Sequence, residues 1–364
     1  MSELRVPFMD LHLTDESAEI RQAIDRVIGS AWFVLGPEVN AFEQEFAAAS
    51  GASHAIGVGN GTDAIALILR ALGIGPGDEV ITTPLSAAYT ALAILMTGAR
   101  PVFADIDPER MTIDPAATER AVTARTAALL PVHLYGQPAD MNALAALASR
   151  KGLALIEDCC QAHLATCTGR PVGTFGAAGA FSFYPTKNLG ALGDGGAVIT
   201  KDPALAERIG RLRNGGQSDR YHHVEAGVNS RLDELQAAIL RARLPALRRK
   251  TEQRRALAAE YRAQLRGAPV SVPKEMDAGH VYHLFPIRSR RRTQLQAHLR
   301  TAGVETFVHY PVAISQQPAF AITDPADCPN AILAAGEVLS LPLYPGLQTA
   351  AVRTVADAVR KDTI

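Results

Sequence analysis

One lysine stands in a segment that is suited to covalent chemistry. Lys187 lies in residues 181–200, FSFYPTKNLGALGDGGAVIT, in a loop rich in Gly, Thr and Asn between two apolar runs, and the next charge along the chain is Asp194. Most lysines are solvated surface charges. An ammonium group partly withdrawn from water loses its proton more readily and can then form a Schiff base. The setting therefore favours a nucleophilic lysine.

A second candidate is a cup for an anion. Gly61 and Thr62 follow the apolar run 54–59 and open a helical pattern. Glycine lets the backbone approach an anion, and a helix N-terminus favours phosphate. Ser182 and Thr186 offer further hydroxyls on either side of the lysine loop. A plain tight turn is the simpler interpretation. A dinucleotide site is weakly supported, since GVGNGT has threonine where the third glycine of that motif belongs.

A third candidate is Asp158, which ends the apolar run 153–158. A carboxylate at the end of a buried strand needs a cationic or N–H partner. The partner could be an arginine, a set of backbone N–H groups or a pyridinium nitrogen. An ionised aspartate beside a pyridinium makes that ring an electron sink. A phosphate anchor, a ring-nitrogen partner and a Schiff-base amine together match the requirements of pyridoxal phosphate.

Composition limits the remaining possibilities. Hydrophobic residues make up 48% of the 364 residues, charged residues make up 20%, and the net charge is -1. This is the composition of a globular protein, and it gives no reason to expect nucleic acid or a membrane as a partner. The N-terminus lacks the basic and apolar regions of a signal peptide, so we expect a cytoplasmic protein.

The cysteines raise the question of a metal. Cys160, His163 and Cys167 form a partial zinc set, but no second Cys/His pair completes it. Cys159 adjoins Cys160 and Cys328 is remote, which is a poor disulfide framework. We therefore predict reduced thiols and no metal site.

Apolar runs alternate with helical patterns over the first two-thirds of the chain. This alternation predicts a doubly wound, mostly parallel sheet covered by helices on both faces. The predicted strands are residues 54–59, 78–83, 100–106, 126–134, 153–160, 178–183 and 195–200.

The pattern changes after Leu232, where a long charged helix begins, with Pro245 as a break. Shorter segments follow it. We predict a large α/β domain with an N-terminal arm over residues 1–240 and a smaller α+β domain over residues 241–364.

These motifs resemble the DegT/DnrJ/StrS family of pyridoxal-phosphate sugar aminotransferases, within fold type I. The resemblance runs nearly end to end. SFYPTKNLG followed by GDGGA, with NSRLDELQAA downstream, is its most specific part. It also covers GNGTDAI, LGIGPGDEVI, RPVFADIDP, PVHLYGQPADM, IEDCCQAH, HVYHLFPIR, VHYP and VLSLPLYP.

The resemblance implies roles for the central residues. Lys187 matches the lysine that bonds to the cofactor and then moves the proton between cofactor and substrate carbon. Asp158 matches the partner of the pyridinium, and Gln161 matches the residue close to the phenolic oxygen of the cofactor. The phosphate contacts correspond to Gly61, Thr62 and Ser182.

Other positions carry implications about partners. Asn229 matches a phosphate ligand supplied by the neighbouring subunit, which implies a homodimer with shared active sites. His163 and Tyr310 match positions that commonly face the sugar.

Two departures from the family pattern concern the same pocket. The family usually reads T-F-x-A-T after its second strand, with the aromatic stacked on the pyridine ring, but Ala87 occupies that place. Tyr89, two positions on, would point elsewhere on a helix or a strand. Ser315 stands where the family often has a histidine.

The expected function is transamination of a keto sugar, which the resemblance implies is nucleotide-linked, with L-glutamate as the amino donor. A keto-cyclitol aminotransferase needs the same constellation and is the alternative. A non-catalytic protein that keeps only the fold would be expected to lose Lys187 or Asp158. The dehydratases of the family have histidine in place of the lysine, so Lys187 argues against that branch.

Overall fold

The computed structural model describes residues 5–12, 16–320 and 327–362. Its centre is a seven-stranded sheet with the strand order β1-β9-β8-β5-β4-β2-β3. The strands are β1 (His54–Val58), β2 (Glu79–Thr82), β3 (Arg100–Phe103), β4 (Thr126–Leu130), β5 (Ala154–Asp158), β8 (Ala178–Ser182) and β9 (Gly196–Thr200). Only β9 runs against its neighbours. The predicted mostly parallel sheet is confirmed, and each predicted strand segment contains one of these strands.

Helices cover both faces of this sheet. Strand β9 shows the division, since Val198 packs into the core on one face while Ala197 and Ile199 pack into the core on the other. Such strands are apolar throughout because neither face meets water. On the Val198 side lie α3 (Gly61–Ala71), α4 (Tyr89–Leu95) and α7 (Pro203–Leu212); on the other lie α2 (Pro37–Ser50), α5 (Pro115–Ala121), α6 (Met141–Lys151) and α8 (Glu234–Arg243).

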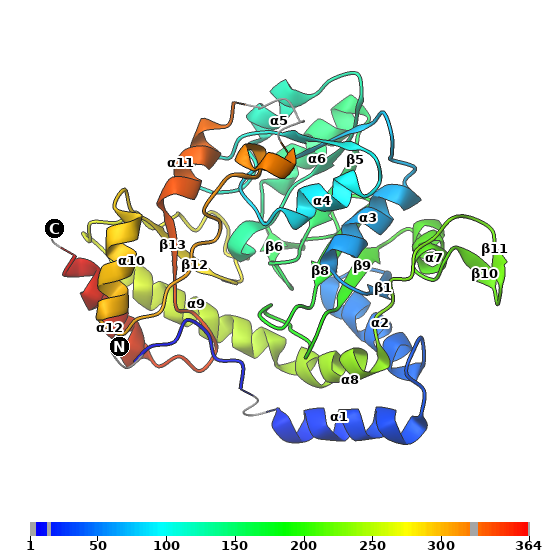
Figure 1. Cartoon of the computed structure of the whole chain (residues 1–364), viewed down its shortest axis with the longest axis horizontal. Helices are drawn as coiled ribbons and strands as arrows, with labels where there is room; N and C mark the ends of the chain where they lie inside the picture. The colour runs from blue at the N-terminus through cyan, green and yellow to red at the C-terminus, as the bar shows by residue number, and fades with distance from the viewer. Residues whose placement is uncertain (1–4, 13–15, 321–326, 363–364) are drawn as a thin grey trace.

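The long charged segment after Leu232 is two helices rather than one. A short 3-10 turn, Leu244–Ala246, separates α8 from α9 (Leu247–Gln264) and contains Pro245. Proline has no N–H to give to the preceding turn, which explains the break. Helix α1 (Ser17–Ser30) lies beside α8 (Figure 1).

The C-terminal third has a core of its own. Strands β12 (Phe285–Arg288) and β13 (Val338–Leu341) pair antiparallel and pack with α9, α10 (Arg292–Thr301) and α12 (Thr349–Arg360). Helix α11 (Pro329–Glu337) contacts β12 and also packs into the buried cluster that contains Phe103 of β3. The domain boundary at residue 240 stays a prediction, and α8 spans that position.

Two small hairpins leave the main body. They are β6 (Thr166–Cys167) with β7 (Arg170–Pro171), and β10 (Gln217–Asp219) with β11 (His222–His223). The second projects from the molecule beyond α7 (Figure 1). In the described ranges, no helix is long and apolar enough to cross a membrane.

Candidate active site

The loop that carries Lys187 joins β8 to β9, which are neighbouring antiparallel strands. Its backbone turns tightly. Lys187 N donates to Tyr184 O at 2.8 Å. A Cβ on Gly190 would lie 2.4 Å from the carbonyl oxygen of Pro185, so only glycine fits the return of the chain. The sequence thus folds this loop into a compact hairpin turn that presents one lysine.

The amine of Lys187 is set up as a nucleophile. Its side chain is half-buried. Burial lowers the pKa of Lys187 below its ordinary value, although the nearby Cys160 and Asp158 raise it part of the way back. Asn188, the next residue, donates from Nδ2 to Val281 O at 3.0 Å and so ties the loop to the C-terminal part of the chain. A lysine with a lowered pKa is neutral, and therefore nucleophilic, at lower pH than a free one.

Asp158 is buried at the end of β5, and both its oxygens have donors. Cys160 N donates to Oδ1 at 3.0 Å, and the hydroxyl of Thr90 donates to Oδ2 at 2.7 Å. These two donors fix the plane of the carboxylate, and its remaining lone pairs can accept from a third donor. The group is therefore oriented to accept from a cationic N–H.

The anion cup is the start of α3. Asn60 caps this helix, with Oδ1 accepting from Asp63 N at 2.8 Å. The first N–H groups of a helix have no partner within it, so those of Gly61 and Thr62 can bind an anion. The role of Gly61 and Thr62 in phosphate binding stays a prediction.

Gly61 also brings the cup against the strand before the lysine loop. A Cβ at this position would lie 2.8 Å from Cβ of Ser182 and 2.7 Å from Sγ of Cys160. Such distances are too short for real side chains, so the close approach depends on glycine. The predicted phosphate ligands Gly61 and Ser182 are therefore direct neighbours.

The segment that contains Asn229 lies beside the same cup. The hydroxyl of Ser230 accepts from Gly59 N at 3.0 Å and donates to Asp63 Oδ2 at 2.6 Å. Asn229 itself is exposed. Its predicted role toward a neighbouring subunit stays a prediction.

Gln161 connects Tyr310 to the main body of the protein. Its Oε1 accepts from Tyr135 N at 2.7 Å, and its Nε2 donates to the hydroxyl of Tyr310 at 3.0 Å. Tyr135 donates from its own hydroxyl to His309 O. Burial raises the pKa of Tyr310 to about 12, with Asp158 adding to the rise, so this phenol keeps its proton.

His163 lies in the core rather than in the open part of the site. It is fully buried, and its ring packs against Phe181 and Phe183. Nε2 donates to Ser182 O at 2.9 Å. Burial lowers the pKa of His163 to about 3, with a further contribution from Lys187, so the ring is neutral. The structure thus places His163 behind Ser182, and its predicted contact with a substrate stays a prediction.

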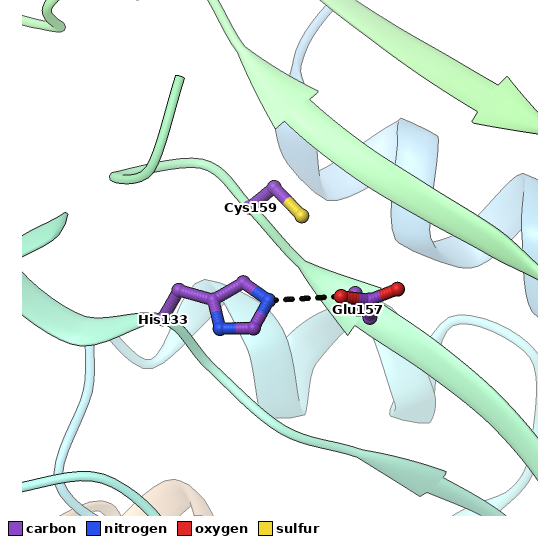
Figure 2. A group of neighbouring side chains, drawn as sticks. All are labelled: His133, Glu157 and Cys159. Atoms are coloured by element: carbon purple, nitrogen blue, oxygen red, sulfur yellow. Dashed lines mark hydrogen bonds and ion pairs between the residues drawn. The ribbon is translucent and has the colours of Figure 1, made fainter. Parts of the chain in front are cut away.

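A cluster of possible metal ligands lies on the other side of β5. Figure 2 shows His133, Glu157 and Cys159 close together, with His133 Nε2 3.2 Å from Glu157 Oε2. The other ring nitrogen of His133 accepts from Ala139 N at 3.1 Å, so Nε2 carries the proton and donates. Glu157 also accepts from the backbone N–H of Gly173 at 2.8 Å.

The third member of this cluster is Cys159, and burial raises the pKa of its thiol well above the ordinary value. Hydrogen bonds among His133, Glu157 and the backbone hold the other two members in place and support β5. The cluster does not include Cys160, His163 or Cys167, the partial zinc set considered from the sequence.

Comparison with known proteins identifies the family. The sequence profile of the DegT/DnrJ/EryC1/StrS aminotransferase family matches residues 14–360. The chain belongs to this family. The aminotransferase is 49% identical over 363 residues to the dTDP-3-amino-3,4,6-trideoxy-alpha-D-glucose transaminase of Streptomyces venezuelae, covering 98% of this chain and 96% of that one.

Two further similarities are informative. The UDP-N-acetyl-3-dehydro-alpha-D-glucosamine 3-aminotransferase of Acidithiobacillus ferrooxidans is 44% identical over 98% of this chain and 97% of its own length. The crystal structure of S. venezuelae DesV in complex with a ketimine intermediate superposes with a TM-score of 0.95 at 50% identity, covering 98% of both chains. The predicted family, fold type I architecture and enzyme class are confirmed.

The cofactor of the family is pyridoxal phosphate, and the residues present fit it. The narrow cradle at Gly61 and Ser182 offers N–H and hydroxyl donors to a phosphate. Asp158 is an oriented acceptor for a pyridinium N–H. Lys187 supplies an amine with a lowered pKa. The assignment of each of these residues to a part of the cofactor stays a prediction.

Sequence reasoning missed residues that hold the site together. Thr90 was not singled out, although it aligns with the threonine that ends the family pattern T-F-x-A-T, three positions after Ala87. The contact of Tyr135 with Gln161 uses a backbone N–H, so no side-chain type could have indicated it. Ala87 is half-buried. The buried hydroxyl oxygen of Ser315 has no hydrogen-bond partner within the described part of the chain.

Proposed function

We propose that this chain transfers an amino group to C3 of a nucleotide-linked 3-keto sugar, with L-glutamate as the donor. The observation that carries the proposal is the grouping of Lys187, whose pKa is lowered by burial, with Asp158 and the Gly61–Ser182 cradle. Pyridoxal phosphate supplies the electron sink that makes the substrate carbon acidic. The two relatives described above are both named for a 3-amino or 3-dehydro sugar nucleotide, which supports C3.

The site residues would have separate roles. The Gly61, Thr62 and Ser182 donors would hold the phosphate, and Asp158 would keep the ring nitrogen protonated. Once an incoming amine has displaced it, Lys187 Nζ would act as a general base and take the proton from the donor carbon. It would then act as a general acid and return that proton to a different atom. Because burial lowers the pKa of Lys187, less of its amine is protonated at a given pH than in a free lysine.

The test separates the two half-reactions. Glutamate added to the yellow holoenzyme should remove the visible absorption band, and a 3-keto sugar nucleotide should restore it. Lys187→Ala should abolish both changes while Lys201→Ala, a lysine outside the site, should leave them intact. A wild-type enzyme whose spectrum does not respond to glutamate contradicts the proposal.

The same screen decides between this function and the alternatives. Restoration of the band by keto-cyclitols and not by keto-sugar nucleotides would identify a cyclitol aminotransferase. An unchanged spectrum with every amine and ketone would favour a non-catalytic protein that keeps the fold.

We include a homodimer with shared sites in this proposal. Trp32, Phe33 and Val34 form an exposed apolar run with 57%, 50% and 41% of their surfaces accessible, and such clusters mark association surfaces. Asn229 is exposed next to the cup. The location is taken to be the cytoplasm, where reduced thiols persist; the cysteines 159, 160, 167 and 328 are all free.

Subunit mixing tests the sharing of sites. Lys187→Ala and Asn229→Ala homodimers should each be impaired, but their mixture should regain up to about a quarter of wild-type activity, because each heterodimer has one intact site. If Asn229 serves its own subunit, both sites of a heterodimer are defective and the mixture stays impaired.

A further inference from the structure

Tyr89 is a large, exposed aromatic residue next to Thr90, which contacts Asp158 in the candidate active site. It is the first residue of α4, and 66% of its surface is exposed. The next residue, Thr90, is buried and donates to Asp158 at 2.7 Å. The backbone of Tyr89 is therefore fixed close to this carboxylate, while its side chain contributes little to the core.

A second phenol approaches the same place from the C-terminal part of the chain. Ile314 N donates to Pro84 O at 2.8 Å, which joins the segment before α4 to the segment after Tyr310. Ala88 and Tyr310 pack against the same buried cluster. Tyr89 also contributes to the raised pKa of Tyr310, after burial, Asp158 and Cys160.

The two hydroxyls are free to bind a ligand. Tyr310 accepts from Gln161 at 3.0 Å and keeps its proton to donate elsewhere. Among the described residues, nothing hydrogen-bonds to the hydroxyl of Tyr89. A phenol combines an apolar ring with a donor and acceptor at its tip. This combination suits a sugar, which presents C–H groups on one face and hydroxyls at its edges.

We propose that Tyr89 contacts the sugar ring of the acceptor substrate, opposite Tyr310, and so selects for that substrate. The inference rests on the proposed function. Glutamate and the sugar must react at the same place beside Lys187, but the sugar is the larger molecule and extends further from it. An exposed residue at the edge of the site should therefore affect the sugar half-reaction and spare the glutamate half-reaction.

The experiment compares Tyr89→Phe, Tyr89→Ala and the control Leu95→Ala in the holoenzyme. Leu95 ends the same helix and is 41% exposed. For the sugar half-reaction, we expect KM to rise about 5-fold in Tyr89→Phe and 10-fold or more in Tyr89→Ala, as one hydrogen bond and one ring contact are lost. The glutamate half-reaction should stay within about twofold of wild type in all three variants.

A double variant sharpens the test. If both phenols hold one ring, Tyr89→Phe and Tyr310→Phe should be non-additive in the KM for the sugar. Equal losses in both half-reactions, or no change in either, would overturn the inference. So would a changed oligomeric state of Tyr89→Ala by light scattering, because the tyrosine would then serve an interface.

The two proposals fail in different ways. If the wild-type enzyme aminates no nucleotide-linked keto sugar, the proposed function is overturned. The assignment of Tyr89 to that substrate is then overturned as well. An active wild type whose Tyr89 variants behave like Leu95→Ala overturns the Tyr89 assignment alone.

Discussion

The hydroxyl of Thr90 donates to Oδ2 of Asp158 at 2.7 Å, although the two residues are 68 positions apart along the chain. Both side chains are buried. This bond joins the first turn of α4 to the end of β5, and so links the residue that would hold the ring nitrogen to the helix that carries Tyr89. The orientation of Asp158 therefore depends on a helix that supplies no ligand of its own to the phosphate cup.

Thr90→Val should weaken cofactor binding. The variant keeps the shape of the side chain and removes one donor from a buried carboxylate. Because hydrogen bonds to charged groups contribute about 1.5–3 kcal/mol, we expect the dissociation constant of the cofactor to rise about 10- to 100-fold. Equilibrium dialysis of the reconstituted protein measures it. Thr90→Ser, which keeps the hydroxyl, should recover most of the affinity; equal losses in both variants would contradict this explanation.

Gly61→Ala should also impair cofactor binding. The added methyl group would lie 2.8 Å from Cβ of Ser182 and 2.7 Å from Sγ of Cys160, so the phosphate cup must open. We expect a loss of affinity of tenfold or more by the same dialysis. Gly210→Ala in α7 is the matched control, since a Cβ there meets nothing within 4 Å and alanine favours a helix by about 0.5–1 kcal/mol. A Gly61→Ala protein with normal affinity would show that the cup is not as narrow as described.

Cofactor attachment should depend on pH through Lys187. In the folded protein the pKa of Lys187 lies below its ordinary value of 10.5. The amine is protonated at a pH below this lowered pKa and is a neutral nucleophile above it. The rate at which apoenzyme forms the visible band should thus rise with pH, with a midpoint below 10.5. Stopped-flow absorbance provides the measurement. Lys187→Arg keeps the charge and should form no band at any pH, while a midpoint at or above 10.5 would disprove the shift.

His163 should make the protein less stable in acid. Its pKa is about 3 in the folded protein and 6.5 ordinarily, so as the pH falls below 6.5 the unfolded chain binds the proton first. Between pH 6.5 and about 3, His163 should lower the free energy of unfolding by about 1.4 kcal/mol for each unit that the pH falls. His163→Gln keeps a donor for Ser182 O and does not titrate. Urea unfolding at several pH values should therefore show a shallower slope for the variant, and parallel slopes would refute the prediction.

Glu157→Gln should destabilise the fold more than it affects chemistry. Glu157 accepts from His133 and from the N–H groups of Gly173, Phe175 and Gly176, so an amide NH₂ would face a donor. We expect a loss of about 2–4 kcal/mol in the free energy of unfolding.

The matched control for Glu157 is Glu119→Gln. Glu119 is an exposed ion-pair residue and should change stability by less than about 0.5 kcal/mol. Chelation with EDTA should leave both stability and activity unchanged, because the cluster around His133 is held by hydrogen bonds. Loss of stability on chelation would instead identify a bound metal.

The sequence allowed the sheet to be predicted because its strands are buried on both faces. Runs such as 126–134 and 195–200 are apolar almost throughout, and parallel strands with helices between them leave few other architectures. Lys187 and Asp158 could be singled out for a related reason. Each is a charged group next to an apolar strand. Burying a charge there costs free energy, so such a residue is expected to have a partner or a chemical role.

The supporting contacts could not be predicted in this way. Thr90 is a threonine with no distinguishing neighbour in the sequence, and only the docking of α4 beside α3, β2 and β3 brings it to Asp158. His163 has the residue type of a ligand, but the rings of Phe181 and Phe183 around it are set by the fold. Tyr89 was expected to point away from the ring-stacking position, and its exposure on α4 became visible only once the helix was placed.

The hairpin between β8 and β9 bears on the order in which the protein folds. The two strands adjoin both in the sheet and along the chain, and residues 183–195 join them. Closing this loop costs less entropy than bringing together Thr90 and Asp158, which are 68 positions apart. The contact between Thr90 and Asp158 must wait for a distant helix to dock. We therefore expect a refolding chain to protect the amides of this hairpin early, while the ability to capture cofactor appears only with the last, slow phase. Pulsed hydrogen exchange alongside absorbance would time the two events, so the nucleophile would be in place before the site can use it.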